Sequence, residues 1–287
     1  MEHVRLENVP ALRRPVLVAA FEGWNDAADA ASSAARYLRD RWSARPFGDI
    51  DPEEFYDFSS TRPHVRLVDG VTRQIDWPSN ELSAAELPGT SRDVVVLLGT
   101  EPQLRWRTFA SEVVGLAGRL NIELVVILGA LLADVPHTRP VRVTGTAADA
   151  GLVERLDLAH STYEGPTGIV GVLHDAFRQA GLPSASLWAA VPHYVAATPS
   201  PKASLALVRR TARLLSTSVT TDDLQSAAED YERQVSEVVA ADDDVSAYVS
   251  RLEASVDEGD LADMEIPSGD ALAAELERFL RDQRGGG

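Results

Sequence analysis

The hydrophobic pattern near the start of the chain predicts a buried strand followed by a helix. Pro15–Phe21 is a short apolar run rich in Val, Leu and Ala, which is typical of a strand covered on both faces. Gly23 permits a sharp turn, after which Asn25 is expected to cap a helix and Asp26 to lie in its first turn. Small and apolar residues then recur at helical spacing, at Ala28, Ala31, Ala35, Leu38 and Trp42. This stretch predicts the opening of a βαβ unit.

Strands and helices alternate in the same way as far as Ser216. The elements expected in order are a strand at Asp93–Leu98, a helix at Trp106–Leu120, a strand at Glu123–Leu128, a strand at Val141–Thr144, a helix at Asp149–Leu156, a weak strand at Thr162–Glu164, a helix from Thr167 or Gly168 to Gln179, a strand at Ala185–Val191 and a helix at Ser200–Leu215. Ala130–Pro140 is expected to be a long polar turn. This order predicts a three-layer α/β/α domain with a mostly parallel sheet.

The segment between the first helix and Asp93 is less regular. Short strands are expected at Phe47–Ile50 and Glu54–Phe58, and Val4–Glu7 is expected to form an edge strand. Asp69-Gly70 is a strong hairpin signal between two alternating runs, so we expect a hairpin of Val65–Val68 and Val71–Trp77. Pro78–Gly89 is interpreted as a loop.

The composition changes after residue 216 and predicts an acidic helical appendage over residues 217–287, beside a core domain over residues 1–216. Its first helix is expected to be capped by Thr221 and to bury one stripe of side chains, Leu224, Ala228, Tyr231, Val235 and Val238. A second helix is expected at Val245–Val256 and a last one at Asp270–Arg281, after a linker at Glu258–Ser268 and before a disordered end at Gly285–Gly287. These helices are too short to be stable alone and must pack on the core or on another subunit.

Charge and cysteine content narrow the possible partners. The net charge of −17 argues against a nucleic-acid backbone or an anionic membrane as a binding partner. The chain has no cysteine, no signal peptide at its N-terminus and no apolar run long enough to span a bilayer. We therefore expect a cytoplasmic protein.

Six polar residues lie in the turns that follow the predicted strands, where open α/β sheets bind ligands. They are Asn25, Asp26, Glu101, His137, Arg139 and His193. A carboxylate, a histidine and an arginine that converge there would suit acid–base work or anion binding. Four of them also have a local structural interpretation: Asn25 and Asp26 as helix-capping residues, Glu101 as a turn acceptor and His193 as a turn histidine. His137 and Arg139 are the best functional candidates, because a long polar turn that carries both is not needed for packing.

No catalytic signature accompanies these six residues. The chain has no HExxH pair, no GxSxG elbow and no histidine cluster with metal-ligand spacing, so no catalytic residue, metal or cofactor is predicted. Gly165–Gly168 precedes a helix and indicates either an anion cradle or a tight contact between that helix and the sheet. It lacks the lysine and the spacing of a nucleotide-binding loop.

The chain contains the motif FEGWND with an Ala-rich helix after it, and the segments Leu97–Trp106, Gly129–Ala147, Gly165–Leu173 and Val191–Val195. These motifs resemble the proteasome assembly chaperone 2 (PAC2) family in its long actinobacterial form. The resemblance spans roughly Pro15 to Ser216 and extends to the acidic helical tail. It implies a core similar to purine nucleoside phosphorylases and related hydrolases.

The resemblance also implies a function, but it does not identify a chemical reaction. It favours a non-enzymatic homo-oligomer, expected as a trimer, that handles proteasome subunits. Chaperones that dock on proteasome rings often end in a hydrophobic residue, Tyr and any residue, whereas this chain ends Asp282-Gln283-Arg284 and three glycines, which does not predict that docking mode. The alternative is a small-molecule hydrolase or nucleoside-type transferase, which requires Glu101, His137, Arg139 and His193 to share one enclosed pocket.

Overall fold

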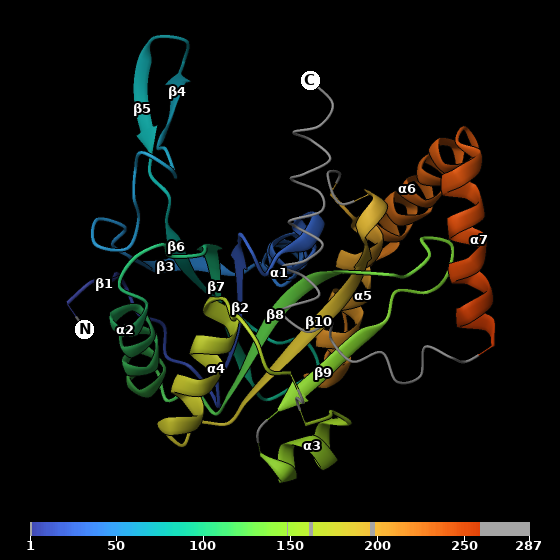
Figure 1. Ribbon diagram of the computed structural model, residues 1–287. Coiled ribbons are helices and arrows are strands. Elements are labelled where there is room, and N and C mark those ends of the chain that lie inside the picture. The colour runs from blue at the N-terminus through green and yellow to red at the C-terminus, as the bar shows by residue number, and fades with distance from the viewer. Residues whose placement is uncertain (1, 148, 161–162, 196–198, 259–287) are drawn as a thin grey trace.

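An eight-stranded mixed sheet forms the centre of the molecule in a computed structural model, which describes residues 2–147, 149–160, 163–195 and 199–258 (Figure 1). The strands in spatial order are β1 (Val4–Leu6), β3 (Arg45–Ile50), β6 (Asn80–Glu86), β7 (Asp93–Thr100), β2 (Val16–Glu22), β8 (Leu124–Ala133), β10 (Ser184–Pro192) and β9 (Val143–Ala147). The four strands β7, β2, β8 and β10 are parallel. Antiparallel strands flank this parallel centre on both sides.

Helices cover both faces of the sheet and complete the three layers that the sequence predicts. On one face lie α1 (Ala30–Arg41), α3 (Ala150–Leu156) and α5 (Pro201–Leu214), with a core that includes Leu38 and Leu207. On the other lie α2 (Trp106–Arg119) and α4 (Ile169–Gln179), with a core that includes Phe109. Alternate residues of β2 enter the two cores, because successive side chains of a strand point to opposite faces. The α/β class is confirmed.

The hairpin signal is confirmed at Asp69-Gly70. Strands β4 (His64–Val68) and β5 (Thr72–Asp76) pair only with each other, and both turn residues have positive φ, at 52° and 71°. Figure 1 shows this ribbon projecting away from the central sheet.

Two further helices, α6 (Asp222–Ala240) and α7 (Asp243–Asp257), follow the core. α6 packs on α5, and α7 packs on α6, with Tyr231, Val235 and Val249 in a small core between them. Val238, which we expected in the buried stripe, is 70% exposed and Val239 is buried in its place. The expected linker, last helix and tail after residue 258 lie outside the described residues, as does part of the strand expected at Thr162–Glu164, and the domain division at residue 216 stays a prediction.

Three other expectations about elements were wrong. Pro78–Gly89 is not a loop, because β6 forms there between β3 and β7. Glu54–Phe58 forms turns instead of a strand, since the backbone N–H groups of Phe55 and Tyr56 both donate to the carbonyl of Pro52. The strand expected to end at Leu128 continues as β8 to Ala133, paired with β10 along its length, which shortens the expected long turn.

Candidate functional site

The six candidate residues form two groups, and in the described part of the chain their hydrogen bonds and ion pairs are separate. Asn25, Asp26 and Glu101 lie in the turns after β2 and β7. The other three, His137, Arg139 and His193, lie beyond β8 and β10 and contact α6, α7 or the loop beside them.

Glu101 joins three elements at the carboxyl end of the parallel strands. Its backbone N–H donates to the carbonyl of Glu22 over 2.8 Å, which ties the β7 turn to the β2 turn. Its carboxylate accepts from the backbone N–H of Ile169 over 2.7 Å and from that of Trp24 over 3.2 Å. The carboxylate therefore occupies the N-terminus of α4, where free N–H groups and the helix dipole favour an anion.

Gly168 permits the close approach of α4 to this junction. A Cβ atom at residue 168 would lie 2.1 Å from Oδ1 of Asn25 and 2.7 Å from Oε1 of Glu101. The geometry at Gly168 thus agrees with a tight contact between α4 and the sheet. The carboxylate at the N-terminus of α4 is that of Glu101, from the chain itself, and not an external anion.

Asp26, and not Asn25, is the residue that caps the first helix. Asp26 Oδ1 accepts from the backbone N–H groups of Ala31 and Ser32 over 2.6 and 3.1 Å. Its second oxygen, Oδ2, is buried without a partner, as is Oδ1 of Asn25. Burial raises the pKa of Asp26 above its usual value, because an ionised carboxylate is poorly solvated there.

A second buried pair next to this junction was not predicted from the sequence. The hydroxyl of Tyr56 donates to the carbonyl of Thr100 over 2.5 Å, and the side-chain amide of Asn80 donates to the same hydroxyl. Burial raises the pKa of Tyr56, so the phenol stays a donor. No sequence signal marked Asn80, because its strand was interpreted as a loop.

His137 is buried at 3% exposure between the core and α6. The Tyr194 hydroxyl accepts from the backbone N–H of His137 over 2.8 Å and lies 2.9 Å from Nδ1 of the same residue. Nε2 lies 3.0 Å from Oγ of Ser236, whose own proton goes to the carbonyl of Glu232. Ser236 is therefore the acceptor for an Nε2–H, and Nδ1 accepts from Tyr194, which requires a neutral imidazole.

The electrostatics of this cluster agree with a neutral histidine. Burial lowers the pKa of His137, and the nearby Lys202 ammonium lowers it further. Burial raises the pKa of Tyr194 to about 12, so its hydroxyl keeps its proton at neutral pH. We call His137, Tyr194 and Ser236 the His137 cluster.

Arg139 and its neighbour Thr138 bind α7. Arg139 makes two parallel hydrogen bonds to the carboxylate of Asp257, at 3.0 and 2.7 Å, and a longer one to Glu253 at 3.4 Å. The Thr138 hydroxyl donates to Glu253 as well. The hydrogen bonds from Arg139 lower the pKa of Asp257, since they stabilise its ionised carboxylate.

His193 lies in an aromatic group that also faces α7. Its Nδ1 is 3.2 Å from Oδ1 of Asp134, an ion-pair distance without the geometry of a hydrogen bond. The Tyr248 hydroxyl of α7 donates to the same Asp134 oxygen over 2.7 Å. The rings of His193, Tyr194 and Tyr248 meet edge to face at centroid distances of 5.6 to 6.2 Å.

Lys202, the single lysine of the chain, completes the attachment of α6. Its ammonium donates to the carbonyl of His137 and to the carboxylate of Glu232. From the sequence we had no reason to select it, because partners 30 and 65 residues away leave no local pattern.

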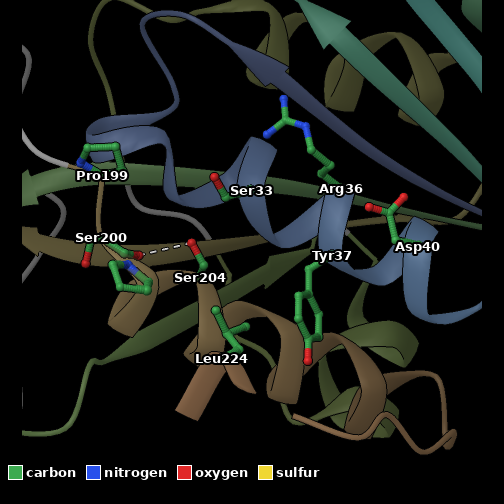
Figure 2. Close-up of a pocket in the computed structure, with 9 residues that line it drawn as sticks. Ser33, Arg36, Tyr37, Asp40, Pro199, Ser200, Ser204 and Leu224 are labelled. Carbon is green, nitrogen blue, oxygen red and sulfur yellow. Dashed lines mark hydrogen bonds between the residues drawn. The ribbon is translucent and has the colours of Figure 1, made fainter. Parts of the chain in front are cut away.

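A surface cavity of about 320 Å³ lies elsewhere, between α1, the start of α5 and α6 (Figure 2). Its lining includes Tyr37, Ser200 and Leu224 but none of the six candidate residues. Tyr37 points from α1 toward α6, where its hydroxyl donates to Asp223 over 2.6 Å. The cavity is therefore bordered by contacts that attach α6 to the core.

The described residues contain neither a cluster of metal ligands nor a membrane-spanning helix. Among the described residues, no three His, Cys, Asp or Glu side chains could hold a metal ion together. No helix in the described ranges is long and apolar enough to cross a membrane. The polar residues beyond the parallel strands mostly bind other parts of the same chain.

Comparison with known proteins relates the chain to one family. The model of the PAC2 family matches residues 20–239. A PAC2 family protein from Streptomyces avermitilis has a similar structure, with a TM-score of 0.77, 47% identity and coverage of 82% of this chain and 99% of that one. A search of curated proteins finds no match.

Two further structures carry names that refer to the proteasome. A proteasome-assembly chaperone homologue from Mycobacterium tuberculosis is 50% identical, with a TM-score of 0.75 over 82% of this chain and 99% of that one. The archaeal proteasome activator PbaB from Pyrococcus furiosus shares the fold at 15% identity, with a TM-score of 0.68 over 83% and 99% of the two chains. Because the family model covers most of the sequence and the fold agrees, the chain belongs to the PAC2 family.

Proposed function

We propose that this chain is a non-enzymatic interaction protein that assists proteasome assembly by binding proteasome subunits as a homo-oligomer. Its family and its 50% identity to a proteasome-assembly chaperone homologue support this role. The role implies a cytoplasmic protein, as the sequence predicts, and the sequence resemblance implies a trimer.

One observation carries the non-enzymatic part of the proposal. The residues best suited to chemistry, His137 and Arg139, are bound to Ser236 and Asp257 of the C-terminal helices. Glu101 is bound to the N-terminus of α4. An acid–base group needs access to a substrate, and these three are committed to intramolecular partners.

The experiment is affinity capture of the tagged full-length protein from a lysate of its own organism, followed by identification of the captured proteins and small molecules. We expect proteasome subunits, recovered above a capture with an unrelated acidic protein that carries the same tag. Purified proteasome subunits should then bind the protein directly.

A null result in both the capture and the direct binding assay would overturn the proteasome assignment. Recovery of a small molecule that is lost in His137→Ala, with the variant still folded, would instead favour the enzyme alternative.

A further inference from the structure

The ribbon of β4 and β5 is amphipathic, although among the described residues its strands pair only with each other and belong to no core. We call residues 61–77 the hairpin arm. Val65, Leu67 and Ile75 fall on one face of the pairing register, where Arg73 pairs with Leu67. Trp77 continues this face just beyond β5, and the four hydrophobic side chains are each at least half exposed. The opposite face is polar and includes Arg66, which hydrogen-bonds to Gln74 and Asp76.

This apolar face is the main concentration of exposed hydrophobic side chains on the described surface. Five of the nine exposed large hydrophobic side chains belong to the arm, including Val71 at its tip. Only the base of the arm has an aromatic contact, where Trp77 packs edge to face on Phe58 at 4.8 Å. Contiguous exposed apolar surface of this kind marks an interaction site.

The arm needs a partner that is present whenever the protein is folded. A two-stranded ribbon without a covered face is at best marginally stable in water, and its open edges invite pairing with other chains. A partner met only occasionally would leave the apolar face exposed for most of the time. A second copy of the same chain is present at equal concentration from synthesis onward.

Charge favours a copy of this chain as the occupant. The arm contains three arginines and two aspartates, a net charge of +1, whereas the whole chain carries −17. At physiological ionic strength, charges more than about 8 Å apart are largely screened, so the local charge decides which surfaces approach each other. The arm can therefore approach the acidic surface of a second copy without the like-charge repulsion that two acidic surfaces of this chain would experience.

We propose that the hairpin arm packs its apolar face against a second copy of this chain and thereby holds the homo-oligomer together. The proposal rests on the homo-oligomer of the proposed function and names its contact. Attachment through a projecting arm leaves most of the surface of each copy available for a different partner.

The test is sedimentation of the full-length protein over a range of concentrations, with three double variants. Val65→Glu with Ile75→Glu places two charges on a cross-strand pair of the apolar face. Thr72→Glu with Gln74→Glu adds the same charge to the polar face and is the matched control. Val65→Ser with Ile75→Ser removes the apolar contact without adding charge.

We expect the wild type and the polar-face control to associate alike. Both apolar-face variants should associate at least about 30-fold more weakly, the loss expected when an interface loses a hot spot. The circular dichroism spectrum should stay unchanged, because the arm lies outside the two cores.

Two outcomes overturn the inference: a wild type that is monomeric, or apolar-face variants that associate as the wild type does. The second outcome would assign the arm to a different protein and leave the proposed function intact. Arm-dependent association together with failure to capture proteasome subunits would support this inference and refute the proteasome assignment alone.

Discussion

Replacement of Glu101 by Gln tests whether this residue is a structural junction. The two side chains have the same shape, but Gln is neutral and has one acceptor oxygen. In the protein, the Glu101 carboxylate accepts two backbone N–H groups from separate elements, Trp24 after β2 and Ile169 at the start of α4. The amide can accept from only one of them, and its NH₂ group then faces the other donor.

The expected cost follows from these contacts. A hydrogen bond to a charged group contributes about 1.5–3 kcal/mol, and an anion at a helix N-terminus about 0.3–1 kcal/mol. We expect Glu101→Gln to lower the free energy of unfolding by about 2–4 kcal/mol.

The assay is urea unfolding monitored by circular dichroism, with urea chosen because guanidinium salt would screen the charge. Glu54→Gln is the control, since Glu54 makes an ion pair with Arg105 at the surface, where such pairs contribute about 0–1 kcal/mol. If Glu101→Gln costs no more than this control, the carboxylate does not hold the junction, and a role for Glu101 toward a ligand would have to be reconsidered.

Three further predictions concern the same two groups. Gly168→Ala should destabilise the protein by about 1–3 kcal/mol in the same assay, because the new methyl group would displace Asn25 and Glu101. Gly118→Ala, at an exposed position of α2 with open space around it, should cause no loss, and a Gly168→Ala variant as stable as that control would contradict the close approach. Wild-type stability should fall as the pH drops below about 6.5. The pKa of His137 is lowered in the folded protein, so below this pH the unfolded chain binds a proton at His137 more readily than the folded chain does. His137→Gln should show a shallower fall over this window, and identical slopes would rule out His137 as the source. Arg139→Ala should speed proteolytic cleavage in α7 through the loss of the Asp257 contact, whereas Arg178→Ala on α4 should leave that rate unchanged.

The parts of the fold that are encoded locally were predictable from the sequence. Strand β2 is apolar from Val16 to Phe21 because helices cover both of its faces, and Ser200 caps α5 with Pro201 at its first position as expected. Strand β6 was missed because its seven residues, NELSAAE, are polar or small except for Leu82 and follow Pro78. Pairing with β3 and β7 determines its conformation, and no single-sequence pattern carries that information.

For the candidate residues too, the sequence indicated their local setting but not the partners that lie far away in the chain. The sequence singled out His137 and Arg139 because it placed them in a long polar turn, yet it could not show what they bind. Their partners Ser236 and Asp257 lie about 100 residues later on helix faces that otherwise look like solvated surface. Asn25 was favoured as the cap by residue type, whereas the backbone turn after Gly23 brings Asp26 to the helix N–H groups instead.

The position of Lys202 has a chemical consequence. It supplies the one side-chain amine of this 287-residue protein, and that amine is 16% exposed and engaged by Glu232 and the carbonyl of His137. An acylating reagent, or an enzyme that attaches a modifier through lysine, finds one side-chain acceptor, and that acceptor is occupied while α6 is docked. The rate at which Lys202 is acylated would therefore report how often α6 leaves the core, at one defined position and without an engineered residue.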